Sequence, residues 1–357
     1  MPGMEARLCN RGAELRQFLK RFCPGLDRPR RRFFFQSVSG ILLSGSLMVS
    51  RWLRFIHDRC REGFWRHKRL LNQINHGCWD HAAVLGGYQR QWGRKIGPDT
   101  PLIVDLSDLP RRRARKLKYL SLVRDGSEGT LVSGYWCLEI YARWNKHCLT
   151  PLLLRPYSSE DPAVGSENAM ILQGVDEVFA ASEGRGVLVM DRGADRSELL
   201  YPWIDAGRRF VIRQRGDRHV ILPGGVHIEA SLLIDRLLQH SSRRIVFCQV
   251  ALPDRPDVPL WLAGKVLPGK ARPLIVLSSL RCENLDQAKQ VLQYYRWRWG
   301  CEEAARFLKT DLGLEQMALR KYESFARMLL LATLAMGFLG WPALARPTLI
   351  RWLCAAG

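Results

Sequence analysis

The 357-residue sequence lacks the patterns that identify several common protein classes. Its ten cysteines are scattered, without a Cys-x-x-Cys pair or a Cys/His cluster at zinc-ligand spacing. No internal repeat, low-complexity segment or signal-peptide pattern stands out. We therefore expect a cytoplasmic protein with reduced thiols, and we exclude disulfide and zinc scaffolds.

Long hydrophobic runs are also scarce. The only long uncharged apolar run covers residues 328–345, and it contains two glycines and a proline. A buried helix explains this run better than a membrane span does. We therefore expect no membrane partner.

Acidic residues are few compared with basic ones. The chain has 55 Lys+Arg against 34 Asp+Glu, which gives a net charge of +21. An excess of this size indicates an anionic partner, most commonly a polyphosphate, with a membrane surface or simple solubility as alternatives. The hydrophobic content of 47% is sufficient for a packed core, so the chain is not a disordered basic tail. We expect a globular protein that binds nucleic acid.

The basic charge is concentrated towards the N-terminus, because residues 1–98 carry more than half of the net charge. Apolar residues recur at helical spacing in segments 42–56 and 64–74. The basic run 28–32 suits either phosphate contacts or an ordinary solvated surface. We predict a helical, basic, DNA-binding domain over residues 1–98.

The pattern beyond residue 98 predicts a mixed α/β sheet flanked by helices. Expected strands are 101–105, 130–141, 148–154, 186–190, 209–213 and 274–278, and expected helices are 167–181, 197–206 and 285–311. Alternation with period two predicts a β-rich insertion within this core. The predicted domains are a first core part at 99–215, the insertion at 216–272, a second core part at 273–340 and a short C-terminal tail at 341–357.

Two aspartates are the first candidate site residues. Asp105 and Asp191 each follow a short apolar run that we interpret as a strand. A carboxylate at the end of a buried strand is rigidly held and can bind a hard cation such as Mg²⁺. Asp108 is the alternative to Asp105.

Four further candidates lie in the predicted helix 285–311. Tyr295, Arg298, Glu302 and Lys309 fall within about 60° on one face of a regular helix. An exposed ion pair between Arg298 and Glu302 is the alternative interpretation, because the two residues are four apart. The spacing alone does not separate these interpretations.

Together these residues resemble a known family. The pattern Tyr-x2-Arg-x3-Glu-x6-Lys is similar to the Y-R-E-K signature of bacterial insertion-sequence cut-and-paste DDE transposases, and segments 104–108 and 189–195 resemble that family's two aspartate strands. The resemblance covers roughly residues 33–338. It implies an RNase H-like catalytic core with a β-rich insertion.

The resemblance also implies a mechanism and partners. Asp105, Asp191 and Glu302 would hold two Mg²⁺ or Mn²⁺ ions, and Arg298 and Lys309 would bind DNA phosphates. Tyr295 and Arg192 are expected at the same DNA, with Arg213 and Arg215 as weaker candidates. Trp297, Trp299 and Trp261 could stack on a flipped base or belong to the core.

The implied activity is metal-dependent cleavage of transposon-end DNA and strand transfer into target DNA. It would be performed by a homodimer on terminal inverted repeats, in the bacterial cytoplasm at the nucleoid. Two alternatives remain open: a stand-alone RNase H-like nuclease, and a truncated DNA-binding remnant without catalysis.

Overall fold

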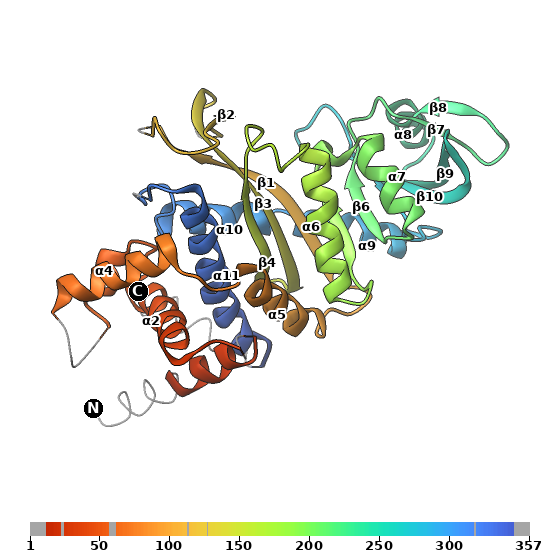
Figure 1. Ribbon diagram of the computed structural model, residues 1–357. Coiled ribbons are helices and arrows are strands. Elements are labelled where there is room, and N and C mark those ends of the chain that lie inside the picture. Colours follow the sequence, from red (N-terminus) through yellow and green to blue (C-terminus); the bar gives the residue numbers. More distant parts are fainter. Residues whose placement is uncertain are drawn as a thin grey trace. The chain divides into compact units, whose positions relative to one another are not determined.

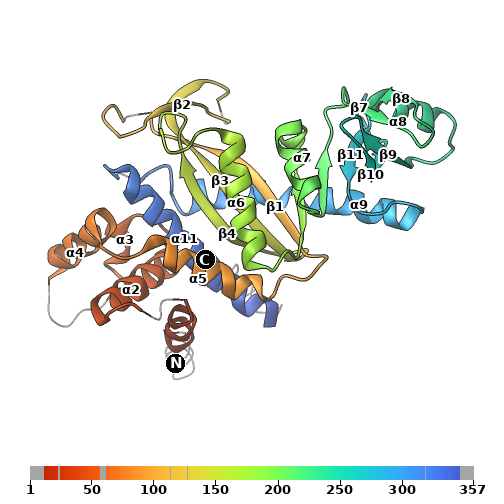
Figure 2. The ribbon, with the colours of Figure 1, turned by 45° about the vertical axis from the view of Figure 1, so that its right-hand side comes forward.

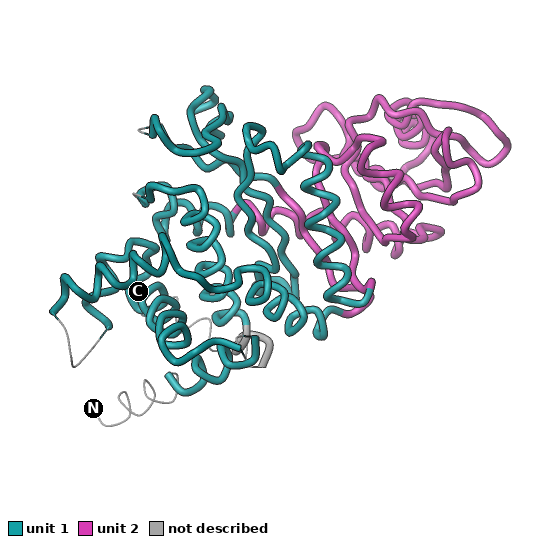
Figure 3. The backbone as a smooth tube through the Cα atoms, in the orientation of Figure 1, with its two compact units in different colours: residues 1–96, 106–183, 303–357 teal, residues 97–105, 184–302 magenta. Residues whose placement is uncertain are grey.

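The computed structural model describes residues 12–22, 25–56, 62–112, 114–126, 128–317 and 319–345. Most of the predicted C-terminal tail therefore lies outside the described residues. The chain forms two compact units (Figure 3). Unit 1 comprises Met1–Ile96, Leu106–Glu183 and Glu303–Gly357, and unit 2 comprises Gly97–Asp105 and Gly184–Glu302. Both combine helices with strands, so the fold is mixed α/β, as predicted (Figure 1). The predicted domain boundaries stay a prediction.

Unit 1 begins with helices. Residues 12–20 are helical, and α2 (Arg28–Ser44), α3 (Val49–Trp52), α4 (Gly63–His76) and α5 (His81–Gly93) follow. Helix α2 ends at Gly45, whose φ of 57° is a left-handed cap that favours glycine. The stretch 42–56 therefore belongs to two helices, although its spacing suits one. The break is fixed by Trp52, whose Nε1–H donates to the Ser46 carbonyl at 2.6 Å.

The strands of unit 1 are covered by helices on both faces. They are the second half of β1 (Pro101–Pro110), β2 (Ser121–Arg124), β3 (Leu131–Asn145) and β4 (Cys148–Tyr157), and β3 pairs antiparallel with β2 and β4. Helix α6 (Glu167–Ala181) crosses β3 (Figure 2), and a Cβ on its Gly174 would lie 2.5 Å from Leu138. On the other face, the Tyr135 ring packs 5.7 Å from Phe325 of α11 (Tyr322–Ala345). Covering both faces explains why the central part of β3, residues 134–142, is almost continuously buried.

Helix α11 contains the long apolar run of the sequence. By length and composition alone, Tyr322–Gly340 could cross a membrane, which is weak evidence for a span. In the structure 72% of that window is buried, and the helix packs along β4, α2 and α4. We therefore assign α11 as a core helix, in line with the prediction.

Unit 2 is built on a mixed sheet. The first half of β1, β5 (Val187–Met190) and β6 (Phe210–Arg213) run parallel. Strands β11 (Leu274–Ser278), β10 (Arg255–Lys265) and β9 (Ile245–Leu252) continue from β6 in antiparallel order, and β7 (His219–Ile221) and β8 (His227–Glu229) pair beside them. The helices of this unit are α7 (Ser197–Asp205), α8 (Ala230–Gln239) and α9 (Leu285–Trp297). Helix α9 packs against five strands of the sheet, which gives it a fixed position over the core.

The segment predicted as a β-rich insertion contains a helix as well as strands. Helix α8 buries Ala230, Leu233 and Ile234 at helical spacing. It approaches β10 closely at Gly264, where a Cβ would lie 2.4 Å from a methyl carbon of Ile234. Strands β9 and β10 extend the sheet of unit 2, so this segment shares its core.

The predicted single helix 285–311 is wrong in detail. Helix α9 ends at Trp297, α10 (Gly300–Arg306) follows, and Phe307–Asp311 forms a π-helical turn. Tight hydrogen bonds from Arg298 N–H to the Tyr295 carbonyl at 3.0 Å, and from Cys301 N–H to the Arg298 carbonyl at 2.9 Å, change the helical pitch. The four signature residues therefore do not share one regular helix face.

Candidate active site

Asp105 and Asp191 lie on neighbouring parallel strands of unit 2. The pairing of β1 with β5 places Leu102 opposite Leu188 and Ile103 opposite Val189. Asp105 and Asp191 each lie two residues beyond the last paired residues, Ile103 and Val189. Since paired strands are about 4.8 Å apart, the two aspartates follow segments that are direct neighbours in the sheet.

Only one of these aspartates ends its strand. Asp191 directly follows β5, and its carboxylate accepts a hydrogen bond from the Gly193 N–H at 2.8 Å. Asp105 lies within β1, which continues to Pro110, so the prediction of a strand end there was wrong. The strand continues to Pro110 because β1 is also hydrogen-bonded to β3, and the Ser107 hydroxyl donates to Glu139 of that strand.

Asp108, the alternative first carboxylate, belongs to unit 1 and has a different partner. Its Oδ1 accepts from Lys309 Nζ at 2.9 Å, and both side chains are largely buried. Lys309 lies in the π-helical turn after α10. The structure therefore describes Lys309 as the partner of Asp108, and its predicted contact with DNA stays a prediction.

Arg298 connects two of the three predicted catalytic carboxylates. Its guanidinium lies 2.7 Å from Glu302 Oε1 and 3.5 Å from Asp105 Oδ2. The arginine side chain is only 9% exposed, whereas Glu302 is 47% exposed. Asp105 and Glu302 are thus held near one another by a cation that belongs to the chain.

The surroundings of Arg298 keep it charged. Burial by itself would lower the pKa of Arg298, but Cys301, Asp105, Tyr295 and Glu302 together raise this pKa above its ordinary value. The buried Nε of Arg298 has no hydrogen-bond partner among the described residues. A buried donor of this kind favours an acceptor that enters the site from outside, such as a phosphate oxygen.

Cys301 is a site residue that the sequence analysis missed. Its Sγ is 3.0 Å from Asp105 Oδ2, within reach of a thiol hydrogen bond, and the residue is fully buried. The sequence offered one signal of this role: Cys301 lies three residues after Arg298 and directly before Glu302. None of the six described cysteines forms a disulfide, so the Cys301 thiol is not engaged in one.

Tyr295 and Arg192 occupy contrasting positions. Tyr295 is buried, its hydroxyl lies 3.4 Å from the Arg213 guanidinium, and its ring lies under both Arg213 and Arg298. It packs beneath these cations, so a direct DNA contact would need a rearrangement. Arg192, directly after Asp191, is exposed. Among the tryptophans considered for base stacking, Trp299 is exposed and Trp261 is buried.

The loop after Asp191 is held by a buried ion pair that the sequence did not reveal. Asp195 is almost fully buried and pairs with Arg218, and it accepts from the Arg215 N–H at 2.8 Å. The partners follow Asp195 by at least twenty residues, so no local pattern indicates them. The pair fixes the chain that carries Asp191.

The carboxylates fit a hard dication chemically, because Mg²⁺ and Mn²⁺ prefer oxygen ligands. Within the described residues, however, no three His, Cys, Asp or Glu side chains are grouped so that they could hold a metal ion. The position of Arg298 between Asp105 and Glu302 accounts for part of this. An ion that binds the same oxygens has to share them with Arg298 or displace it.

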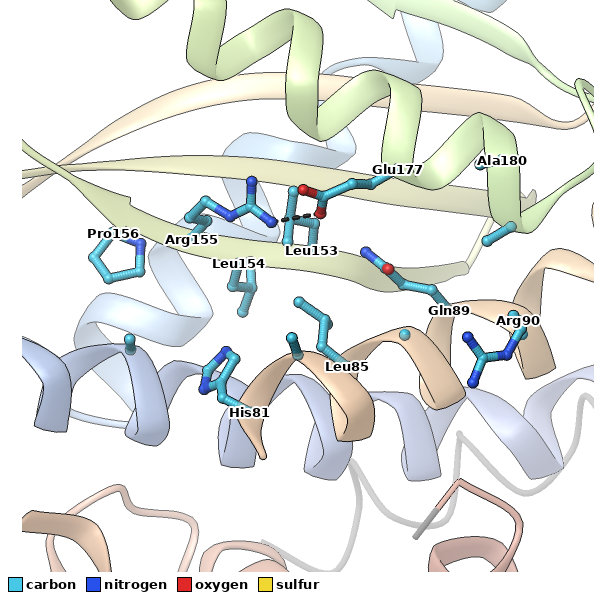
Figure 4. A pocket seen from close by; sticks show the side chains of 14 residues that line it. His81, Leu85, Gln89, Arg90, Leu153, Leu154, Arg155, Pro156, Glu177 and Ala180 are labelled. Carbon is cyan, nitrogen blue, oxygen red and sulfur yellow. Dashed lines mark hydrogen bonds and ion pairs between the residues drawn. The ribbon is translucent and has the colours of Figure 1, made fainter. Parts of the chain in front are cut away.

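A separate cleft of about 560 Å³ lies in unit 1 between α5, β4 and α6 (Figure 4). It is lined by His81, Leu85, the Arg155–Glu177 ion pair and neighbouring residues, and it contains none of the predicted site residues. Burial, with Arg155 and Arg327 nearby, lowers the pKa of His81 to about 4. The cleft therefore has a neutral histidine at neutral pH.

The model of the Transposase DDE domain family matches residues 145–338, more than half of the chain. This region contains Asp191, Arg298, Glu302 and Lys309 and begins after Asp105. No curated protein matches the sequence.

A piggyBac transposase, solved by cryo-EM in a synaptic complex with hairpin DNA, is similar at 16% identity. The similarity covers 91% of this chain and 68% of that one, with a TM-score of 0.48. The family model, by contrast, matches more than half of the chain, which is sufficient to assign the family. The chain belongs to the Transposase DDE domain family and is a transposase.

Proposed function

We propose that this transposase cuts the DNA ends of its own element with Asp105, Asp191 and Glu302 and then joins them to target DNA. The observation that supports the proposal is the pairing of β1 with β5, because Asp105 and Asp191 each follow its last paired residues by two positions. Glu302 is linked to Asp105 through Arg298. The proposal adds Asp191, which follows the neighbouring strand β5, to this pair.

These carboxylates would hold two Mg²⁺ or Mn²⁺ ions. When bound, such ions supply positive charge that activates the attacking oxygen and neutralises the leaving oxygen of the phosphodiester. The chain's own part is to hold the carboxylates. Cys301 and Arg298 fix Asp105, and the Gly193 N–H fixes Asp191.

Basic side chains would position the DNA. Arg298 has a buried Nε that can donate to a phosphate, and Arg192 is exposed next to Asp191. Lys309, which belongs to unit 1, would bind a phosphate once its side chain leaves Asp108. The Tyr295 ring packs against the Arg298 guanidinium and would hold it in position.

The proposed partners are the terminal inverted repeats of the element and the target duplex. The net charge of +21 favours binding to both through their phosphates. We propose that the protein acts as a homodimer, one copy at each repeat, in the bacterial cytoplasm at the nucleoid.

The proposal is tested with a labelled duplex that carries the repeats flanking the gene, incubated with Mg²⁺. We expect the wild type to cut at the repeat boundary and Glu302→Gln to lose this activity. Glu303→Gln is the matched control, because Glu303 is the exposed neighbouring acid of the same helix and should leave cutting intact.

Other results identify the alternatives. DNA binding without cutting by the wild type would indicate a DNA-binding remnant and overturn the proposed chemistry. Cutting without strand transfer into a target plasmid would indicate a stand-alone nuclease.

A further inference from the structure

The first turns of α4 present aromatic side chains to solvent. Phe64 is 66% exposed and Trp65 is 48% exposed, and their rings meet edge to face at 5.4 Å. Phe55, which follows α3, is 42% exposed. The Arg66 guanidinium donates to the Ile56 carbonyl, so the segment with Phe55 lies against the start of α4.

The other half of α4 anchors the helix to unit 1. Leu70 and Ile74 are buried, and the Ile74 carbonyl accepts from Arg327 of α11 at 2.8 Å. Asn75 accepts from the hydroxyl of Ser324, also of α11, at 2.8 Å. Because these contacts hold the helix, the exposed rings are not needed to keep it folded.

Cations accompany the exposed rings. Arg51, Arg54 and Lys68 are exposed, and Lys68 Nζ lies 5.3 Å above the Trp65 ring. We call these six residues the α3–α4 surface: Phe55, Phe64, Trp65, Arg51, Arg54 and Lys68. Exposed rings and exposed cations in one segment of the chain, with Lys68 above the Trp65 ring, suit a partner that offers flat apolar faces and negative charge together.

We propose that the α3–α4 surface binds DNA whose bases are unpaired or unstacked, as at a strand end, a gap or a junction. Phosphates alone would account for the cations but not for the aromatic rings. In an intact duplex the base faces are covered by their neighbours, so rings can stack only where a base face is accessible. The inference rests on the proposed function insofar as DNA is the substrate, and it adds a DNA contact at α3 and α4 of unit 1.

The test compares two labelled probes in fluorescence anisotropy with the full chain. One probe is an intact duplex, and the other is the same duplex with a short single-stranded gap. We expect Phe64→Ala with Trp65→Ala to weaken binding to the gapped probe about tenfold or more, because two stacking contacts are lost. The same variant should bind the intact duplex within about twofold of wild type.

Two further variants separate stacking from charge and from folding. Trp65→Phe keeps a ring and should retain most of the affinity for the gapped probe. Lys68→Gln should weaken binding to both probes alike and lower the salt dependence by about one phosphate contact.

The stacking role would be overturned if the double-alanine variant lost equal affinity for both probes. It would also be overturned if Trp65→Phe bound the gapped probe as weakly as the double-alanine variant does. Wild-type affinity of the double variant for both probes would assign the surface to a protein or membrane partner and also overturn the proposal. If the wild type binds neither probe, the proposed function itself fails.

Discussion

At the scale of single residues, Arg298 has the largest effect on how the site can work. It supplies positive charge between Asp105 and Glu302, which would otherwise repel each other. A divalent ion drawn to the same oxygens therefore competes with a cation that is already in place. Once displaced, the guanidinium can donate to DNA, so ion binding and DNA binding should favour each other.

Replacing Arg298 with Gln should therefore strengthen Mn²⁺ binding to the DNA-free protein, by roughly tenfold, because a competing charge is removed. DNA cleavage should fall at the same time, since a phosphate contact is lost. Titration calorimetry with Mn²⁺ measures the first effect and the labelled duplex measures the second.

The control is Arg296→Gln, an exposed arginine two residues earlier, which should leave the Mn²⁺ affinity unchanged. Weaker Mn²⁺ binding by Arg298→Gln would mean that the arginine organises the carboxylates for the ion and does not compete with it.

His81 makes stability depend on pH. Its pKa is lowered to about 4 by burial and by Arg155 and Arg327, whereas the unfolded chain takes up a proton near pH 6.5. The unfolded state therefore binds more protons between these values, and the free energy of unfolding should fall by up to about 3 kcal/mol as the pH drops from 6.5 to 4.

Urea unfolding as a function of pH measures this loss. His81→Asn should flatten the dependence in that window, and His147→Asn, at an exposed histidine, should not. An unchanged pH profile in His81→Asn would show that other groups cause the loss.

At the scale of elements, the sequence predicted best where local signals agree with the tertiary environment. Helix α6 and strand β11 have the predicted bounds, because a Ser166 cap starts the helix and a fully apolar run forms the buried strand. Helix α8 was missed because it is a short helix within a segment where period two dominates. The break at Arg298 was missed because a change of helical pitch leaves no mark on residue spacing.

The close approach of α8 to β10 depends on one glycine. Gly264→Ala would place a Cβ 2.4 Å from Ile234, so the helix has to shift. We expect a loss of about 1–3 kcal/mol in the free energy of unfolding, typical of overpacking.

Denaturant titration measures this loss, and Ile234→Ala in the Gly264→Ala background should recover part of it. Gly97→Ala, where the nearest atom would be 3.8 Å away, is the control and should cost little. An equal loss at both glycines would show that the contact with Ile234 is not the cause.

The candidate site was predictable only in part, because some of its residues have local sequence signals and others do not. Asp105 and Asp191 follow runs that are recognisable as strands, and Glu302 belongs to a specific motif. Cys301 and Asp195 act through partners far away in the sequence, and such contacts require the fold. The pairing of Lys309 with Asp108 belongs to this second group.

At the scale of the whole molecule, the net charge of +21 should dominate the affinity for DNA. If four phosphates are contacted, raising the salt concentration from about 50 to about 200 mM should weaken binding about a hundredfold through counterion release. Anisotropy titrations at several salt concentrations measure the slope. A flat response would contradict an electrostatic origin, and sucrose at matched osmolality controls for other effects of the solute.

The register between β1 and β5 also limits which insertions and deletions the protein can tolerate. Insertions at the exposed residues 128–130, which precede β3, alter the number of residues between Asp105 and Asp191 without moving either strand. A single deletion within 102–104 would instead turn Asp105 to the opposite face of the sheet, because side chains alternate along a strand. Length variation among natural copies, or an inserted reporter tag, should thus be tolerated at residues 128–130 and eliminated within the strand.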